Sequence, residues 1–456
     1  MRCLGKGIKM DTEKRFDIII RNTKLLDPCF KVRDSVDIGI LNGKIAEIGQ
    51  NIDGGSDQII DGHGLLAMPG LIDAHHHNAQ QLLRAKPIDE YPMVWTRFLV
   101  PFESNLTPED MYISSQLSAL EMIKSGTTAF ADAGGPHMEM TAKVALESGM
   151  RAVIARSVMD MGGNIPDSMK CSAEENIRRT CELFDAWNGA GDGRIRIWFG
   201  IRQVMTCSEK LLRLTSEKAK ELGTGMHAHL CEHKDEVSFC PTNYRMRPAA
   251  WLDETGCLGP NLLTAHNVVL SEDDITLLAE RHVGTVHCPR SNLTNHGFPK
   301  TPRMLRQGLS IGLGSDGACT SSLSLWDEVK VLRNGIIAYW GLPIFDPVVL
   351  PIASLLRMMS QGGADAVMQG DTLGSIEVGK KADMILIDID QPHISPTHNL
   401  PATLVESVNA GDVRHSIIDG RIIMKDRAVL TMDEEKIMYE AKRAMADISS
   451  RAGFRE

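Results

Sequence analysis

Several histidine and carboxylate residues of this chain have a spacing that suits a metal site. Residues 73–77 read Asp-Ala-His-His-His and directly follow the apolar run 66–72. Successive side chains of a strand point to opposite sides, so His75 and His77 can direct both imidazoles at one ion. Three histidines in a row also fit a polar strand end, so this interpretation depends on the rest of the chain.

Three later apolar runs end in residues that can bind metal or move protons. His229 closes one run, with Glu232 about one turn further on, His266 closes the next, and Asp316 lies between glycines at the end of the last. With His229 as third imidazole and Asp316 as carboxylate, the set suits Zn²⁺ or Fe²⁺ and leaves a position for a water that the ion would acidify. A carboxyl group that lies beside the ion without binding to it is suited to shuttling protons, and Glu232 is the candidate for this role.

Eight short apolar segments alternate with stretches of helical periodicity. The segments are 70–77, 127–134, 151–158, 195–202, 225–232, 261–268, 284–291 and 310–317. Apolar residues at helical spacing lie between them, for example at 108–125 and 173–187. Eight such units over roughly 250 residues predict an α/β fold with a closed (β/α)8 TIM-type barrel. Active sites of these barrels lie at the carboxyl ends of the strands, where the candidate residues are found.

The two ends of the chain have a different pattern, with short strands divided by turn signals such as Asn42-Gly43. We expect strands at 16–26, 36–48, 58–67, 382–389 and 416–429. These strands should form a small β-sandwich from both termini, which divides the chain into a composite domain of residues 1–67 plus 375–456 and a barrel domain of residues 68–374. A helix is expected at about 433–450 on the outside, and the first ten residues should be an unstructured leader.

Length and composition limit the function classes. With 456 residues, 43% of them hydrophobic, the chain can form one barrel and a smaller domain. The net charge of −10, with charges interspersed, argues against nucleic acid as a partner. Ten cysteines without CxxC pairs and an N-terminus without a signal-peptide core indicate a reducing cytoplasm. No run approaches the ~18 apolar residues of a membrane span, so we expect a cytoplasmic protein with a small-molecule partner.

The ordered motifs PGLIDAHHH, HAHLCE, LTAHN, VHCPRSNL and GLGSDGA resemble the amidohydrolase superfamily, in its mononuclear deaminase branch. The resemblance runs from about Phe16 over nearly the whole chain. Binuclear relatives carry a bridging lysine at the end of the fourth strand, where this chain has Arg202. The resemblance therefore implies one divalent ion, Zn²⁺ or Fe²⁺. The ligands that it implies are His75, His77, His229 and Asp316.

The resemblance also implies roles in catalysis. Glu232 would protonate a ring nitrogen, and His266 would hold the attacking water or polarise the developing tetrahedral centre. Asp316, besides binding the ion, would take the proton of the attacking water and help to deliver it to the leaving ammonia. Two carboxyls with different proton affinities in a dry site suit this chemistry.

Within the superfamily the chain is most similar to 5-methylthioadenosine/S-adenosylhomocysteine deaminases. The similarity is carried by LLR at 82–84, VPFE at 100–103 and WNG at 187–189. In those enzymes the glutamate that matches Glu103 binds ribose hydroxyls, which favours S-adenosylhomocysteine, methylthioadenosine or adenosine as substrate. They carry a histidine where this chain has Arg202, and a guanidinium changes which acceptors the pocket can satisfy.

Other functions stay open at this point. Arg202 and Gln80 together resemble the base-reading pair of guanine deaminases, which would favour guanine, 8-oxoguanine or a pterin. The histidine run followed by 82–84 is also similar to triazine hydrolases, which remove chloride or amines from an s-triazine. A non-catalytic barrel scaffold is the alternative of another class, although such proteins usually lose the ligands that are retained here. Association into a homo-oligomer is a further expectation from the resemblance.

Several other polar residues are expected to have no direct chemical role. His76 should point away from its two neighbours, and His227 should be a barrel-wall histidine behind His229. Asp132 could reach the pocket or make a structural hydrogen bond. His287 and Asn292 should organise a loop or contact the substrate rather than act as acid or base.

Overall fold

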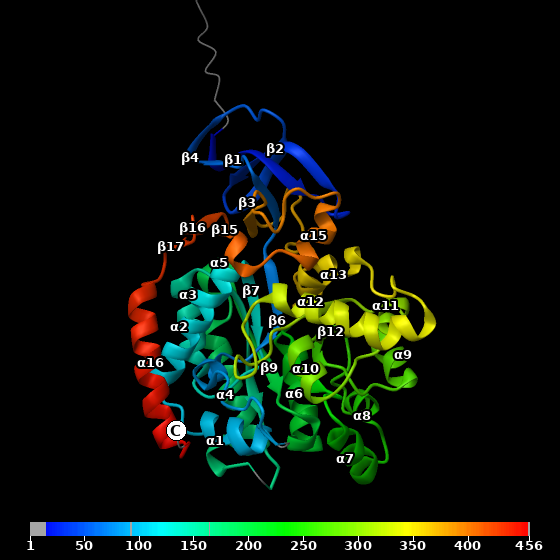
Figure 1. Cartoon of the computed structure of the whole chain (residues 1–456). Coiled ribbons are helices and arrows are strands. Elements are labelled where there is room, and N and C mark those ends of the chain that lie inside the picture. The colour runs from blue at the N-terminus through cyan, green and yellow to red at the C-terminus, as the bar shows by residue number, and fades with distance from the viewer. Residues whose placement is uncertain (1–14, 92–93, 164, 455–456) are drawn as a thin grey trace, which may run out of the picture.

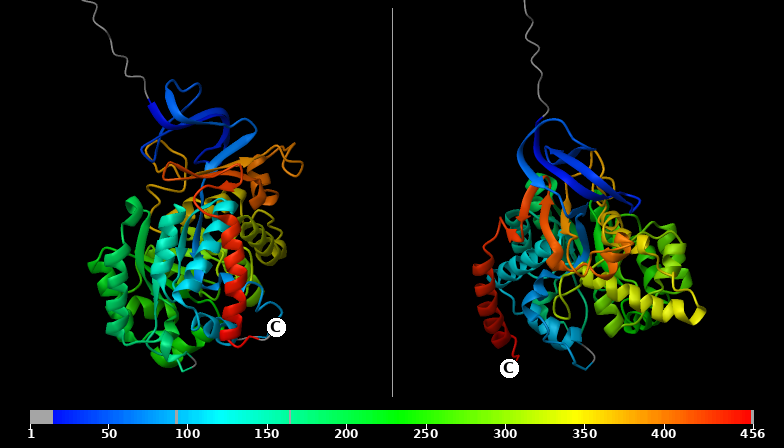
Figure 2. Two further views of the ribbon diagram at one scale, coloured as in Figure 1. Left: turned by 90° about the vertical axis from the view of Figure 1, so that its left-hand side faces the viewer. Right: turned by 45° about the horizontal axis from the view of Figure 1, so that its top comes forward.

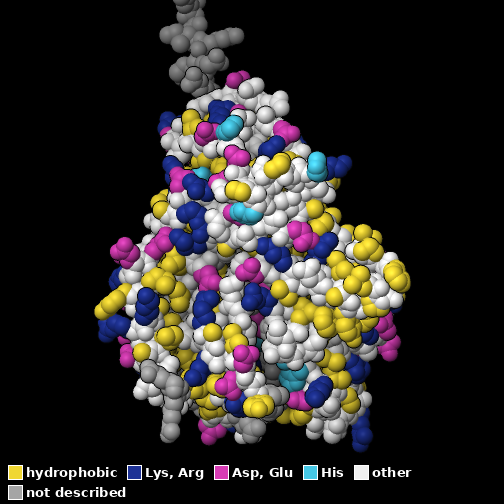
Figure 3. Space-filling view, viewed as in Figure 1, with side chains coloured by type: hydrophobic (Ala, Val, Ile, Leu, Met, Phe, Trp, Pro, Cys, Tyr) yellow, Lys and Arg dark blue, Asp and Glu magenta, His cyan; other side chains and the backbone are white. Residues whose placement is uncertain are grey.

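The computed structural model describes residues 15–91, 94–163 and 165–454. The expected leader over the first ten residues lies outside these ranges. In the described part of the chain, no helix combines the length and the apolar character needed to cross a lipid bilayer. Acidic and basic side chains are mixed over the face that Figure 3 shows.

Eight parallel strands form a closed barrel, as predicted (Figure 1). They are β6 (Leu71–His76), β7 (Thr127–Asp132), β8 (Arg151–Val158), β9 (Ile195–Ile201), β10 (Met226–Leu230), β11 (Leu262–His266), β12 (Gly284–His287) and β13 (Ile311–Leu313). The ring closes between β13 and β6, where Leu313 pairs with Asp73. Helices cover the outside of the barrel, so most of these strands are buried along their length and read as nearly continuous apolar runs.

The helices that cover the barrel begin and end at recognisable signals. The longer ones are α2 (Pro108–Ser125), α3 (Met138–Ser148), α4 (Ala173–Trp187), α6 (Glu209–Glu221), α7 (Lys234–Tyr244), α9 (Glu272–Glu280), α12 (Leu325–Ile336) and α13 (Ile352–Met359). In α2, Thr107 accepts a hydrogen bond from the Asp110 amide while the Asp110 carboxylate accepts one from the Thr107 amide, which closes a capping box. Gly126 ends this helix at a φ of 90°, a conformation that glycine adopts at little cost.

Strands from the two ends of the chain form one continuous, mixed sheet of nine strands. They are β1 (Arg15–Leu26), β2 (Val32–Leu41), β3 (Lys44–Gly49), β4 (Gly55–Asp61), β5 (Leu65–Pro69), β14 (Met384–Asp388), β15 (Val413–Ile418), β16 (Arg421–Lys425) and β17 (Ala428–Val429). The two ends meet where β5 pairs with β14 in antiparallel register, and residues such as Ile20, Ile38 and Met384 share one apolar cluster. The expected assembly of both termini is thus confirmed.

The sheet lies at the end of the barrel from which β6 enters (Figures 1 and 2). Arg151 at the start of β8 makes a two-point ion pair with Asp383, at 2.9 and 3.1 Å, and both side chains are buried. The last helix, α16 (Glu434–Arg451), lies outside the barrel against α2, as predicted. That residues 1–67 plus 375–456 and residues 68–374 are separate domains stays a prediction.

Candidate active site

The carboxyl ends of the barrel strands bring the predicted polar residues together. His75 lies in β6, with His77 directly after it, and His229 lies in β10. Asp316 follows the short strand β13 in a left-handed backbone conformation, with a φ of 58°. The three imidazoles are buried and the Asp316 side chain is nearly so.

The Nε2 atoms of the three histidines cluster at the Asp316 carboxylate. His75 and His77 each place Nε2 3.6 Å from Oδ1 of Asp316, and the Nε2 atoms of His77 and His229 are 3.1 Å apart. Four ligands at the 2.0–2.2 Å of zinc bonds lie roughly 3.3–3.6 Å from one another in a tetrahedron. Two imidazole lone pairs facing each other at 3.1 Å repel unless a proton or cation lies between them. The donor set therefore fits a divalent ion.

Contacts behind the imidazoles of His75 and His77 leave the Nε2 atoms of these two residues available to an ion. The Nδ1 atom of His75 lies 2.8 Å from Nε2 of His227, and Nδ1 of His77 lies 3.4 Å from the carbonyl oxygen of Gly134. Such outer contacts set the tautomer and the ring orientation of a metal-binding histidine. His227 was expected to be a barrel-wall residue, and the structure places it directly behind His75. Among the described residues, Nε2 of His75 and Nδ1 of His229 have no hydrogen-bond partner.

The protonation states of the cluster suit metal binding. Burial lowers the pKa of His77 and of His229 well below the ordinary value, and nearby positive groups, chiefly Arg202 and His75, lower these pKa values further. Burial alone would raise the pKa of Asp316, but its contact with His75 and the field of the other histidines hold it well below the usual value. Neutral imidazoles and an ionised carboxylate are the forms that bind a divalent cation.

His266 at the end of β11 belongs to the same cluster, and one group of candidate ligand atoms comprises those of His75, His229 and His266. The contact of His266 with Asn292 separates it from the ligands. Nδ2 of Asn292 lies 2.9 Å from Nδ1 of His266, while Oδ1 of Asn292 accepts the Cys288 amide at 3.1 Å. The amide nitrogen is thus the donor, so Nδ1 of His266 is the acceptor and Nε2 carries the hydrogen. A protonated Nε2 can donate into the site but cannot ligate.

Glu232 lies beside the cluster, after the end of β10. Its Oε1 is 3.2 Å from Nε2 of His296 and 3.9 Å from Nε2 of His266. Burial would raise the pKa of Glu232, but the interaction with His266 and the contact with His296 lower this pKa to about 2. Glu232 is therefore an ionised carboxylate near neutral pH. His296 was not predicted as a site residue, because no sequence pattern shows where the residue that caps the short helix α10 (Pro289–Asn295) will lie.

The three predicted substrate-binding residues meet at one carboxylate oxygen. Nε2 of Gln80 donates to Oε1 of Glu103 at 2.8 Å, and Nη2 of Arg202 lies 3.2 Å from the same oxygen. All three side chains are buried. Gln80 lies in a 3₁₀ helix (Asn78–Leu83), Glu103 ends α1 (Val100–Glu103), and Arg202 follows β9. Arg202 also approaches Nδ1 of His77 at 3.4 Å, which connects this group to the candidate metal ligands.

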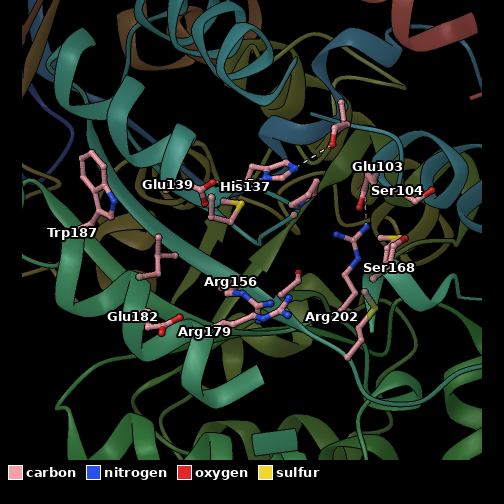
Figure 4. A pocket seen from close by; sticks show the side chains of 18 of the residues that line it. Glu103, Ser104, His137, Glu139, Arg156, Ser168, Arg179, Glu182, Trp187 and Arg202 are labelled. Atoms are coloured by element: carbon pink, nitrogen blue, oxygen red, sulfur yellow. Dashed lines mark hydrogen bonds and ion pairs between the residues drawn. The ribbon is translucent and has the colours of Figure 1, made fainter. Parts of the chain in front are cut away.

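A cavity of about 560 Å³ begins at Glu103 and Arg202 and extends outward between α3 and α4. Figure 4 shows Arg202 directed at Glu103 on one side of this cavity and Trp187 on the opposite side. Side chains of both charges line the space between them, including Arg156, Arg179, Glu139 and Glu182. The cavity therefore offers room and polar contacts for the remote part of a substrate.

The residues expected to have no chemical role make structural contacts. His76 contacts the Asp316 carbonyl oxygen at 3.0 Å and Oδ1 of Asn78 at 3.2 Å, away from the cluster. Asp132 accepts hydrogen bonds from Asn78 and from the Gly134 amide, and burial raises the pKa of Asp132 to about 6. Nδ1 of His287 contacts the carbonyl oxygen of His266 at 2.9 Å.

Asp73 was missed as a structural residue of the site. Its carboxylate accepts hydrogen bonds from the amide, at 3.0 Å, and from the hydroxyl of Ser315, and so joins the end of β13 to β6. Asp73 and Ser315 belong to two of the sequence motifs, PGLIDAHHH and GLGSDGA, which are far apart in the sequence, and only the closure of the barrel brings them into contact.

The chain is similar to named proteins over most of its length. Over 441 residues the chain is 36% identical to a 5'-deoxyadenosine deaminase of Methanosarcina acetivorans, covering 96% of this chain and 99% of the relative. It is 39% identical over 389 residues to a 5-methylthioadenosine/S-adenosylhomocysteine deaminase of Pelotomaculum thermopropionicum, covering 85% and 87%. An adenosine deaminase from Xanthomonas campestris with bound zinc has a similar structure, with a TM-score of 0.90, 27% identity and coverage of 96% and 100%.

Residues 66–423 match the family model described as "Amidohydrolase family". This match covers well over half of the chain, and the resemblance seen in the sequence motifs is confirmed. The chain belongs to the amidohydrolase family.

Proposed function

We propose that this chain is a metal-dependent hydrolytic deaminase that releases ammonia from an aminated heteroaromatic ring. The substrate class that we propose is an adenosine analogue: S-adenosylhomocysteine, methylthioadenosine or adenosine. The observation that carries the proposal is the position of Glu232, a carboxylate that lies beside His266 at the histidine cluster and is not itself among the candidate ligands. The deaminase names of the relatives support the reaction class.

His75, His77, His229 and Asp316 would hold one divalent ion, which we propose to be Zn²⁺ or Fe²⁺. The zinc bound to the related Xanthomonas adenosine deaminase supports zinc. When bound, the ion would supply Lewis acidity and lower the pKa of a coordinated water toward neutrality.

The side chains of this site can account for every proton of the reaction. Deamination converts a ring C–NH₂ and water into a ring C=O and ammonia, so one proton of water goes to the adjacent ring nitrogen and the other to the leaving amine. Glu232, ionised before the reaction, would carry the first proton, and Asp316 would carry the second. The Nε2–H of His266 would donate to the oxygen on the tetrahedral carbon.

The contacts of Glu103 favour a nucleoside over a free base. Gln80 and Arg202 each direct a donor at Oε1 of Glu103, so both side chains are oriented toward this carboxylate. Among the described residues, no hydrogen bond to Oε2 of Glu103 is found, and Glu103 lines the outer cavity. A carboxylate in this position can accept from two ribose hydroxyls, while the cavity accommodates a 5' substituent.

The alternative functions fit the contacts of the site less well. Guanine, 8-oxoguanine or a pterin would need the guanidinium of Arg202 at a ring oxygen or nitrogen, with Glu103 left buried and without a cation. A triazine aminohydrolase or chlorohydrolase would leave the outer cavity unused. A non-catalytic scaffold would not explain why the four candidate ligands and Glu232 converge.

Ammonia release from a panel of amines tests the proposal. The panel contains S-adenosylhomocysteine, methylthioadenosine, 5'-deoxyadenosine, adenosine, guanine, 8-oxoguanine, pterins, cytosine and aminotriazines. We expect kcat/KM of about 10⁴ M⁻¹s⁻¹ or more for an adenosine analogue, because that is the range of typical enzymes. The Glu232→Gln protein is the matched blank. A free base or a triazine as the best substrate would contradict the proposed substrate class.

We further propose a cytoplasmic location, which the nine described cysteines support, since all of them are free thiols. A small molecule is the partner for which the cavity provides space. The absence of nucleic-acid and membrane partners, and association into a homo-oligomer, stay predictions.

A further inference from the structure

Helix α10 lies against two of the groups that the proposed reaction uses to handle protons. Asn292 and His296 are four positions apart, and the His296 amide bonds to the Asn292 carbonyl oxygen at 2.8 Å, so both side chains lie on one face of this helix. Asn292 contacts His266, and His296 contacts Glu232. Helix α10 and the residue that caps it thus contact a residue at the end of β11 and a residue just after β10.

We propose that His296 is the positioning residue of Glu232, a role that rests on the proposed function. Its Nε2 lies 3.2 Å from Oε1 of Glu232, whereas the next histidine nitrogen, Nε2 of His266, is 3.9 Å away and outside hydrogen-bond distance. Among the described residues, no other contact of the Glu232 carboxylate with a cation is found. His296 therefore holds Oε1 and leaves Oε2 for the ring nitrogen of the substrate.

The surroundings of both residues fit this role. The backbone amide of Glu232 donates to Oε2 of Glu236 at 3.3 Å, so the main chain is fixed while the side chain depends on His296. The His296 ring stacks on His233, with ring centroids 5.7 Å apart, and only a fifth of the His296 side chain is exposed. The His296 ring is thereby held between the end of α10, which His296 caps, and His233, which caps the start of α7.

Positioning predicts a specific pattern in the kinetics of the zinc-loaded full chain. His296→Ala should lower kcat by about 10- to 100-fold, because a misplaced proton carrier slows the chemical step, with little change in KM or in zinc content. His296→Gln, which keeps a donor of similar reach, should recover most of the loss. Asn295→Ala is the matched control, since its side chain bonds to the Ser291 carbonyl oxygen and does not contact Glu232.

A double-mutant cycle separates positioning from a general structural effect. In a Glu232→Gln background, His296→Ala should cause no further loss of kcat, because the group that it positions has already been disabled. An equal loss of kcat in both backgrounds, or a His296→Ala protein within twofold of wild type, would overturn the proposal.

The contact itself can be tested without turnover. In zinc-loaded protein labelled with ¹⁵N-histidine, the His296 ring signals, assigned by their loss in His296→Gln, should shift in Glu232→Gln and stay unchanged in Asn295→Ala. Unchanged signals in Glu232→Gln would overturn the contact. A protein that shows this shift but turns over no amine in the panel would overturn the proposed function, and with it the catalytic role of His296, while the contact would stand.

Discussion

The side-chain nitrogen of Asn292 lies 2.9 Å from Nδ1 of His266, and this contact assigns the ring hydrogen of His266 to Nε2. His75 and His77 direct Nε2 at Asp316, with His227 behind Nδ1 of His75 and the Gly134 carbonyl oxygen behind Nδ1 of His77. Four histidines at one barrel mouth therefore divide into three candidate ligands and one hydrogen-bond donor.

His266→Ala should keep the metal and lose turnover. Because Nε2 of His266 donates rather than ligates, removal of the ring should leave the metal content unchanged but lower kcat by about 10²–10³-fold, as for the loss of one donor to a developing oxyanion. Metal analysis and steady-state kinetics measure both effects, with His229→Ala as the comparison that should lose metal. If His266→Ala loses as much metal as His229→Ala, the assigned tautomer is wrong.

Glu232→Gln should also keep the metal, and its kcat should fall by about 10³-fold or more, since an amide cannot carry a proton to the ring. Asp235→Asn, a neutralised carboxylate three residues further on and exposed, is the control and should remain near wild type. Near-wild-type turnover by Glu232→Gln would contradict the mechanism.

Breaking the buried pair of Arg202 and Glu103 should destabilise the protein. Arg202→Met leaves an uncompensated buried carboxylate and should lower the free energy of unfolding by about 3–5 kcal/mol. The double variant Arg202→Met/Glu103→Gln should recover part of this loss, because no buried charge remains. Chemical denaturation measures both, and equal stability of the single and double variants would argue against the pair.

Glu103→Gln tests the ribose contact separately. We expect a lower kcat/KM for adenosine analogues and an unchanged value for any free base that the enzyme accepts. A uniform loss on both kinds of substrate would indicate that Glu103 acts only through the structure of the pocket.

The stability of the fold should depend on pH through Glu236. Burial raises the pKa of this carboxyl from 4.5 to about 8. Between these two values the folded state binds one proton more than the unfolded state, so the free energy of unfolding falls as pH rises toward 8 and levels off above it. In Glu236→Gln this loss should be absent, and the Tm difference between variant and wild type should grow from pH 5 to pH 8. Parallel Tm curves would refute the assignment, with Asp235→Asn as the control.

The barrel could be predicted from the sequence because each strand is a short apolar run between helices. The largest difference lies at the last strand, expected over 310–317 and found only at Ile311–Leu313. The chain turns after Leu313, and the positive φ of Asp316 directs its carboxylate toward the histidines. The early end of β13 and the turn that follows it place Asp316 in the site. An apolar pattern does not reveal where such a turn begins.

The candidate ligands were also predictable, since two-residue spacing and strand ends are local features. The contacts that set the protonation state or the orientation of each residue were not predictable from the sequence. His227 behind His75, Asn292 at His266 and His296 at Glu232 join segments that are distant in the sequence. Gln80 and Arg202 were expected to bind the substrate, but that they share one oxygen of Glu103 follows from packing alone.

Metal stoichiometry tests the account most directly. The Nε2 atoms of His77 and His229, 3.1 Å apart and both close to Asp316, predict one divalent ion per chain in protein from metal-sufficient medium. Elemental analysis should find that ion in wild type, in Glu232→Gln and in His266→Ala, and should find it lost in His77→Ala and in His229→Ala. Wild-type protein with well below one ion per chain, or with two, would contradict the account.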